Sequence, residues 1–440
     1  MNKQFRITRR GLFWGVLGTL AVVFLSRLKK TKPAYSVHQG YTDKTSTIIT
    51  VLRSELQSFR YAVLVNQSQS PKISINVKVS TQYGSSLDRL DIDGIEVGES
   101  YTLAISENGR VIEQRTFGAM DTDLREPRIA VYSCSADEWR VDHKSMWASL
   151  LSTKPDLIFS LGDNVYLDGS SYGWGVLWPV TPDPARIWRR YTDMRKNLEL
   201  YRQEKLTPMI AVWDDHDFGF NGADSSYEHK DFVKGVFETF FPRPARNSLF
   251  ESGPGVSMCW NSFNTCFIFL DSRYYRVMET SPAAVRTHWG SEQKQWLSSH
   301  LIDSKVPIWL LNGCQFLGGD TTDTDNDSVA SRHPEDLEWL RQQVINTRQN
   351  ITLISGDVHY SEVIQMPSSW GSGLYEISSS ALHAIANEPS GPGTRLALTT
   401  ENNFIILQPV DSSTKEDRIK VTCYGTASTP LFETTISPSR

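Results

Sequence analysis

The sequence predicts an α/β fold preceded by an antiparallel β-sandwich of the immunoglobulin or fibronectin type. From residue 126 to residue 440, short apolar runs alternate with amphipathic stretches, which is the pattern of an α/β domain. Between residues 40 and 125, runs rich in β-branched residues follow one another without a helical stretch. A chain of 440 residues with 39% hydrophobic content can form two domains.

Residues 1–36 have the composition of a signal peptide or a membrane anchor. An apolar run from Gly11 to Leu25 has basic residues on both sides, and its fifteen residues suit a signal sequence better than a spanning helix, which needs about 20. The segment around Arg9 and Arg10 resembles a twin-arginine export signal. Ala34-Tyr35-Ser36 is an acceptable cleavage site, although the basic residues before it leave an uncleaved anchor open.

The predicted sandwich domain, residues 40–125, contains at least five strand-like runs. They lie at residues 48–52, 61–65, 73–77, 101–105 and 111–117. The pair Asn108-Gly109 between the last two runs is the favoured sequence of a tight hairpin turn. This stretch contains no cluster of acidic residues or histidines, so we expect a structural or substrate-positioning role for it.

The predicted α/β domain, residues 126–440, has strands and helices in alternation and returns to strands at its end. Strands are expected at 128–133, 156–161, 209–213, 265–270, 308–312 and 351–355, and again at 404–407, 419–422 and 431–436. Helices are expected at 143–152, 185–202, 230–240, 291–303 and 334–347. His333-Pro334-Glu335-Asp336 is a strong start for the last of these helices.

Charge and cysteine content exclude two classes of protein. A net charge of −5 argues against general nucleic-acid binding, which requires a basic surface. Five scattered cysteines do not form a disulfide framework. Cys259 and Cys266 flank a predicted turn and could face each other across a hairpin, either as a disulfide or as buried free thiols.

Three buried strands end in acidic residues or in acid and histidine together. These strand ends are Gly162-Asp163-Asn164, Asp214-Asp215-His216-Asp217 and Gly356-Asp357-Val358-His359. Ligands of open α/β sheets bind at the carboxyl ends of the strands. Clustered carboxylates and imidazoles at one edge would repel or remain poorly solvated unless a cation lay between them, and a metal pair is the simplest candidate.

A metal pair needs one shared carboxylate and further ligands private to each ion. Asp163 is well placed to be the shared ligand, and Asp215, Asn221 and Asp357 complete a site of oxygen donors. His359 lies two residues beyond Asp357 and shares its face if the chain is extended there. His216 follows Asp215 and could act as general acid or stabilise charge.

Four motifs in order resemble the PhoD-type alkaline phosphatases, a divergent branch of the calcineurin-like metallophosphoesterases. The motifs are Gly162-Asp163-Asn164-Val165-Tyr166, Trp213-Asp214-Asp215-His216-Asp217, Leu270-Asp271-Ser272-Arg273 and Ser355-Gly356-Asp357-Val358-His359. The resemblance covers roughly residues 125 to 440, and the preceding β module is similar to the N-terminal domain of that family. It implies a four-layer α/β/β/α metallophosphoesterase core.

The resemblance also implies the metals and their ligands. Iron(III) would be held by one cysteine, one aspartate, one tyrosine and one histidine, which here are Cys134, Asp163, Tyr166 and His359. Calcium would be held by Asp163, Asn221 and Asp357, with Asp215 and Asp214 as close alternatives, and another divalent metal pair is the other possibility. The chain lacks the Asp-x-His pattern of ordinary metallophosphoesterases and has Ser133-Cys134-Ser135 in its place, which excludes the usual two-histidine set.

Three further side chains are candidates for the site. Arg273 could clamp a phosphate bidentately, or it could form a salt bridge to a carboxylate such as Asp271 or Asp217. Gln315 could reach the pocket as a neutral donor. His383 lies in a stretch that matches the family pattern only loosely.

The sequence therefore predicts an exported metal-dependent phosphoester hydrolase. A metal-activated hydroxide is expected to attack a phosphomonoester or a phosphodiester, with His216 and Arg273 as catalytic residues. Alternatives are a phospholipase D-like activity on lipid head groups and a non-catalytic envelope binding protein of the same fold. The expected location is periplasmic or extracellular, or anchored in the cytoplasmic membrane facing outward, with membrane association possible through the N-terminal segment.

Overall fold

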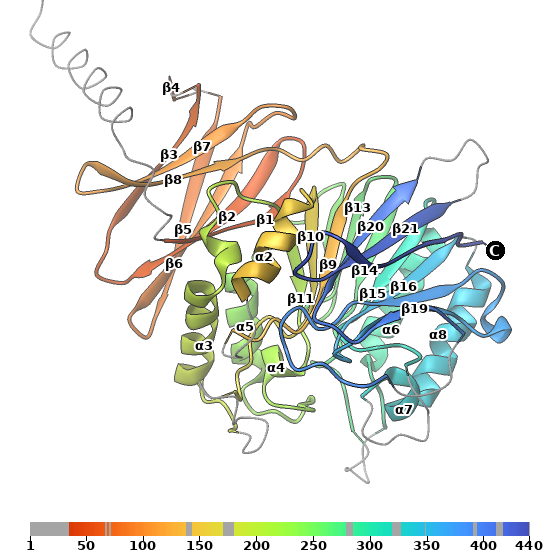
Figure 1. Ribbon diagram of the computed structural model, residues 1–440. Helices are drawn as coiled ribbons and strands as arrows, with labels where there is room; N and C mark the ends of the chain where they lie inside the picture. The colour runs from red at the N-terminus through yellow and green to blue at the C-terminus, as the bar shows by residue number, and fades with distance from the viewer. Residues whose placement is uncertain are drawn as a thin grey trace, which may run out of the picture.

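The computed structural model describes residues 35–439 apart from 67, 70–71, 138–142, 170–179, 279–284, 319–326, 348, 390–393 and 411–416. The chain is a mixed α/β protein with an antiparallel β module at its N-terminal end (Figure 1). The predicted signal peptide or anchor lies almost wholly outside the described residues. Within them, no helix combines the length and the hydropathy that crossing a membrane requires.

The N-terminal module consists of two four-stranded antiparallel sheets, as predicted for a β-sandwich. One sheet has the order β1-β2-β6-β5 and the other β4-β3-β7-β8. The strands are β1 Ser36–Thr42, β2 Ser46–Ser54, β3 Phe59–Val65, β4 Ser68–Gln69, β5 Ser74–Gln82, β6 Ser85–Asp93, β7 Tyr101–Glu107 and β8 Arg110–Phe117. Side chains of both sheets, such as Ile49, Leu90, Leu103 and Ile105, form one apolar core.

The part of the described chain that follows the sandwich contains two larger sheets. The six-stranded sheet has the order β11-β10-β9-β20-β21-β22, with β9 to β11 parallel and the remaining pairs antiparallel. Its strands are β9 Ile129–Tyr132, β10 Leu157–Leu161, β11 Met209–Val212, β20 Phe404–Val410, β21 Arg418–Tyr424 and β22 Pro430–Ile436. The last three of these strands correspond to the strands predicted at the end of the chain.

The eight-stranded sheet has the order β12-β13-β14-β15-β16-β18-β17-β19, and β14, β15, β16 and β18 run parallel in its centre. Its strands are β12 Phe250–Ser252, β13 Met258–Ser262, β14 Thr265–Phe269, β15 Ile308–Leu311, β16 Ile351–Ser355, β17 Ser361–Gln365, β18 Tyr375–Ser378 and β19 Arg395–Thr399. Strands β17 to β19 did not emerge from the sequence pattern.

Helices flank both of these sheets. They are α2 His143–Ser152, α3 Pro184–Asn197, α4 Asp215–Phe218, α5 Lys230–Phe240, α6 Gly290–Asp303, α7 Val329–Arg332 and α8 Pro334–Asn346, with short 3-10 turns η2 Glu199–Arg202 and η3 Ser368–Trp370. The five long helices begin within one residue of the predicted positions, and Pro334 opens α8 as expected. Helix α3 ends at Asn197 because η2 takes over the last predicted residues.

The side chains of each strand point alternately to its two faces, and this explains how the layers are held together. In β10, Phe159 packs into a core shared with Phe267 and Trp309 of the other sheet, whereas Ile158 packs against residues of α2, α3 and α5. In β15, Trp309 takes part in that shared core and Leu310 packs with α6 and α8. Successive side chains of a strand point to opposite faces, so a single apolar run contributes side chains to the cores on both faces of its sheet. Figure 1 shows the two helix groups on opposite flanks.

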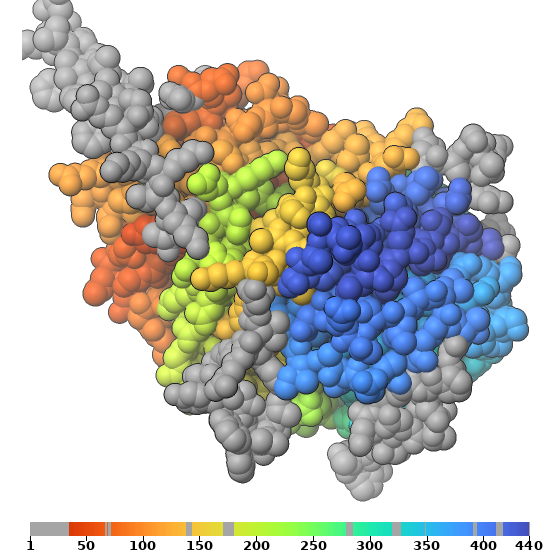
Figure 2. All heavy atoms as spheres, in the orientation of Figure 1, coloured from red at the N-terminus to blue at the C-terminus, as the bar shows by residue number. Residues whose placement is uncertain are grey.

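A buried arginine joins the sandwich to the α/β module. Arg195 of α3 is fully buried, and its guanidinium donates to Oγ of Ser36 at 2.9 Å and to Oγ1 and the carbonyl of Thr50 at 3.0 and 3.2 Å. Its guanidinium carbon also lies 4.5 Å from the ring centre of Tyr201. Burial lowers the pKa of Arg195 to about 10, so the side chain stays charged at neutral pH. In Figure 2 the sandwich, red to orange, lies against the yellow-green segments.

We predict that Arg195→Ala lowers the free energy of unfolding by about 3 kcal/mol, because Ser36 and Thr50 lose a charged donor in a buried place. The midpoint of chemical denaturation measures the loss. Arg110→Ala, at an exposed position in the β7–β8 hairpin, is the control and should leave the midpoint unchanged. Equal midpoints for the two variants would contradict the role assigned to Arg195.

Candidate metal centre

Three parallel strands present their donors in the same way. Cys134 follows β9 by two residues, Asp163 follows β10 by two, and Asp357 follows β16 by two. All three have left-handed backbones, with φ of 56°, 51° and 74°, and His359 has φ of 61°. Such angles are uncommon for residues other than glycine and cluster at functional sites. The backbone therefore turns sharply at each strand end and directs the donors to one place.

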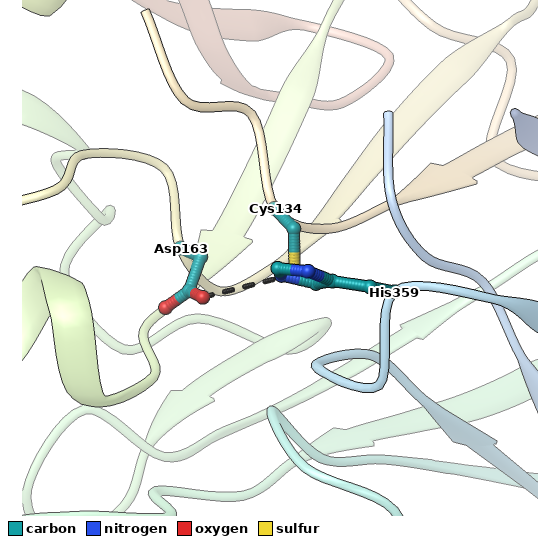
Figure 3. A group of neighbouring side chains, drawn as sticks. All are labelled: Cys134, Asp163 and His359. Carbon is teal, nitrogen blue, oxygen red and sulfur yellow. Dashed lines mark hydrogen bonds between the residues drawn. The ribbon is translucent and has the colours of Figure 1, made fainter. Parts of the chain in front are cut away.

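Cys134, Asp163 and His359 form the first group of donors (Figure 3). One ligand atom from each lies within 4.8 Å of the others, and Sγ of Cys134 is 3.7 Å from Oδ2 of Asp163. The sulfur also lies 3.5 Å from the carbonyl oxygen of Asp357 and 3.2 Å from Oγ of Ser380. Burial, reinforced by Asp163, raises the pKa of the Cys134 thiol well above its usual value. A thiolate here requires a cation beside it.

Two further groups continue the first one. Asp163, Asp215 and His216 make the second group, and Asp214, Asp215 and Asp357 make the third. The groups share Asp163 and Asp215, so they form one continuous array of donors. Burial first, and then neighbouring carboxylates, raise the pKa values of Asp163 and Asp357 well above the ordinary range. A cation placed between these carboxylates would favour their ionised form.

His359 is prepared as a neutral donor. Its Nδ1 lies 2.6 Å from the carbonyl oxygen of Ile385, which can only accept a hydrogen bond, so Nδ1 carries the proton and Nε2 keeps its lone pair. Burial lowers the pKa of His359 to about 4, which leaves the ring uncharged at neutral pH. Sulfur, imidazole and carboxylate donors suit a transition metal, and the carboxylate group suits a hard cation. The residues present therefore fit a metal centre.

Tyr166 lies in the same electrostatic environment. It is buried, and its ring stacks on that of His216 with centres 4.2 Å apart and an interplanar angle of 28°. Burial first, and then Asp163 and Cys134, raise the pKa of its phenol well above the usual value. Like the thiol, the phenolate form needs a neighbouring cation.

His216 is held by an aspartate that the sequence did not single out. Its Nδ1 lies 2.7 Å from Oδ1 of Asp168, and both side chains are buried. Burial disfavours the charged ring, but Asp215, Asp163 and Asp168 outweigh burial and raise the pKa of His216 well above its ordinary value. With Nδ1 occupied by Asp168, the atom left for a substrate is Nε2. Asp168 is only five residues beyond Asp163, yet nothing in this spacing connects it to a histidine of another motif.

Asn221 occupies an exposed position at the edge of the array. Its backbone N–H donates to Oδ2 of Asp168 at 3.0 Å, and the next N–H, of Gly222, donates to Oδ2 of Asp215 at 2.6 Å. These two bonds hold the loop after α4 against the donors. The ligand role of the Asn221 side chain stays a prediction.

Arg273 is fully buried beside the third group. Its Nε donates to Oδ1 of Asp214, and Nη2 donates to Oδ2 of Asp327 at 2.9 Å and lies 3.9 Å from Oδ1 of Asp215. The sequence predicted a possible salt bridge from Arg273 to a carboxylate such as Asp271 or Asp217, but the carboxylates that pair with its guanidinium are Asp214 and Asp327. From Arg273, Asp271 accepts the backbone N–H, at 2.9 Å, and no side-chain donor. Nη1 is buried and has no hydrogen-bond partner among the described residues. It is the nitrogen of the Arg273 guanidinium that the described side chains leave unused.

Asp327 is the second residue that the sequence did not reveal. Both Arg273 and Arg276 donate to it, the latter with two nitrogens. Burial opposes its ionisation, but the two guanidinium groups hold the pKa of Asp327 well below its usual value. Asp327 thereby fixes both arginines, although it lies 54 residues from Arg273 in the sequence.

The weaker candidates lie outside the array. Gln315 donates to Oε1 of Glu362 at 2.9 Å and to Oγ of Ser378 at 2.7 Å in a separate buried network. His383 stacks on the ring of His143 with centres 4.2 Å apart, and its Nδ1 lies 3.0 Å from the carbonyl oxygen of Ala136. Cys259 and Cys266 are free thiols whose sulfurs lie 3.4 Å apart across the β13–β14 hairpin.

Comparison with known families identifies one match. The model of the PhoD-like phosphatase family matches residues 129–409, which span all three strand ends and Arg273. No curated protein matches the chain significantly.

We predict that Asp168→Asn lowers kcat for a phosphate ester about 10- to 100-fold and leaves KM little changed, because an amide can no longer fix the orientation and tautomer of His216. Steady-state kinetics on the purified variant test this. Asp303→Asn, at the exposed end of α6, is the matched control and should behave as the parent does. A full parental kcat for the Asp168 variant would rule out the orienting role.

Proposed function

The chain belongs to the PhoD-like phosphatase family, and from that premise we propose that it is an exported, metal-dependent phosphoester hydrolase. The observation that supports metal dependence is the continuous array of Cys134, Asp163, His359, Asp215 and Asp357. Export is supported by the apolar run of residues 11–25 with basic residues on both sides. We also propose that the two central sheets and their outer helices correspond to a four-layer α/β/β/α core.

We propose iron(III) and calcium as the metals. The thiol of Cys134, the phenol of Tyr166 and the neutral imidazole of His359 are the donors that suit iron, with Asp163 shared between the ions. Asp357, Asp215 and Asn221 would hold calcium, which prefers oxygen ligands. The raised pKa values of Cys134, Tyr166, Asp163 and Asp357 support a cation at this centre, since each ionised donor needs positive charge nearby.

When bound, the metal ions would supply a water activated for attack and positive charge opposite the phosphoryl oxygens. The chain's own residues do the rest. Asp168 fixes His216 so that Nε2 can give a proton to the leaving oxygen. Asp327 and Asp214 hold the Arg273 guanidinium in place, so that its Nη1 can donate to a phosphoryl oxygen.

Phosphomonoesters are the proposed substrates, and phosphodiesters, including lipid head groups, are the second candidate. We propose a periplasmic or extracellular location, or attachment to the outer side of the cytoplasmic membrane through the N-terminal segment. A non-catalytic binding protein of the same fold is disfavoured, because Asp163, Asp215, His216, Asp357 and His359 are all present and a binding protein has no need of them.

We predict that the purified protein contains stoichiometric iron and calcium and absorbs visible light, because ferric iron bound by thiolate and phenolate is coloured. Elemental analysis for Fe, Ca and Zn together with the visible spectrum tests this. Cys134→Ser should lose the iron and the colour, whereas Cys423→Ser, a buried cysteine of β21, should keep both. A colourless, active enzyme loaded with zinc would defeat the iron assignment.

We predict a higher kcat/KM for p-nitrophenyl phosphate than for bis(p-nitrophenyl) phosphate. Asp163→Asn should lower both values about a thousandfold, which equals a loss of about 4 kcal/mol of transition-state stabilisation. Asparagine tolerates the left-handed backbone of Asp163, so the variant should keep its fold, as circular dichroism can check. The opposite order of the two substrates would favour the phosphodiesterase alternative. Unchanged activity in the variant would contradict the proposed centre.

A further inference from the structure

Two loop tips of the sandwich carry large, exposed apolar side chains. Leu56, in the turn between β2 and β3, is 91% exposed, and Tyr83, in the turn between β5 and β6, is 58% exposed. The turns lie against each other, since the N–H of Glu55 donates to the carbonyl of Gly84 at 3.2 Å. Neither side chain has a role in the sandwich core. Because the two tips are adjacent, both apolar side chains can meet the same surface.

The N-terminal segment joins the described chain beside these tips. Tyr35, the first described residue, packs on the ring of Phe59 with centres 5.2 Å apart, and its Oη accepts from Gln57, one residue after Leu56, at 3.4 Å. The 34 residues before it contain the apolar run 11–25 and then, close to Tyr35, a basic stretch with Arg27, Lys29, Lys30 and Lys32. A membrane-inserted or membrane-bound segment would thus bring the tips of this sandwich to the lipid.

The hollow between the tips and α3 is rich in basic residues. It has a volume of about 380 Å³ and is lined by Tyr35, Gly84, Arg53, Lys196 and Arg202, among others. Arg53 is paired with Asp88 at 2.8 Å, and Lys196 lies 3.7 Å from Asp193. Within the described residues Arg202 has no carboxylate partner and donates to the carbonyl of Lys196. Glu55 adds a negative charge at the tips, and of the three basic residues that line the hollow Arg202 is the one without a carboxylate partner in the described part of the chain. Further positive charge comes from Arg27, Lys29, Lys30 and Lys32, which precede Tyr35 in the sequence.

We propose that this end of the sandwich docks on an anionic lipid bilayer, with Leu56 and Tyr83 entering the head-group region and the basic hollow facing lipid phosphates. Apolar tips and basic residues together supply the two signals that stable membrane attachment needs. The inference concerns where the protein lies and is independent of the ester that it hydrolyses.

Spin labelling of the full-length chain on vesicles tests the proposal. All five native cysteines are buried, so Leu56→Cys offers one accessible thiol for a nitroxide label. Ile302→Cys, on α6 and 69% exposed, is the matched control. The vesicles are phosphatidylcholine with and without phosphatidylglycerol. With the anionic lipid, the label at position 56 should become more accessible to oxygen and less accessible to a water-soluble nickel chelate, and the label at 302 should not change.

The charge requirement is tested by Lys196→Gln with Arg202→Gln in the Leu56→Cys background. This variant should lose most of the shift at position 56, even if the N-terminal segment keeps the protein on the vesicle. A label at position 56 that stays as water-accessible as the one at position 302 would overturn the proposal. So would an equal shift on vesicles of phosphatidylcholine alone, or a full shift in the charge variant.

Discussion

The crowding of acidic donors, most of them buried, at one edge of two sheets is the constraint on which the rest of the molecule depends. Asp163, Asp215 and Asp357 lie together with Cys134 and Tyr166, and each loses hydration where it is. The pKa values of Asp163, Asp357, Cys134 and Tyr166 are all raised, so ionisation of these four donors is unfavourable without positive charge between them. A bound cation would convert this unfavourable arrangement into a ligand set, and folding and metal binding would then be coupled.

The surrounding polypeptide is arranged to maintain that crowding. Left-handed backbones at three strand ends direct the donors inward, and buried hydroxyls support them: Oγ of Ser133 accepts from the N–H of Asp357 at 3.2 Å, and Oγ of Ser380 accepts from that of His359 at 2.9 Å. Because Cys134 and Asp163 belong to one sheet and Asp357 to the other, the apolar core between the sheets sets the distances in the centre. Packing far from the donors thus determines how they are spaced.

The sequence predicted those parts of the structure that depend on local pattern. Strands such as β10, buried along its whole length, and helices that begin at a proline carry their signal in neighbouring residues. Strand β1 does not, because its polar residues are satisfied at long range: Gln39 is buried and donates to the carbonyl of Gly118 at 3.0 Å. Asp168 and Asp327 escaped prediction for the same reason. Their partners, His216 and Arg273, lie 48 and 54 residues away, and only the fold brings them together.

Asp168 and Asp327 add two carboxylates beside the donor array, and each of them holds a positively charged side chain. The proposed catalytic residues are both cations, and each is held by a carboxylate that does not belong to any of the three donor groups. A side chain fixed in this way loses little further entropy when it meets a phosphoryl group, and its orientation does not depend on the substrate. Arg273 also contacts Asp214 of the donor array, so the position of the guanidinium is linked to the carboxylates that would hold the metal. The donor array and the proposed phosphate-binding arginine are therefore one network.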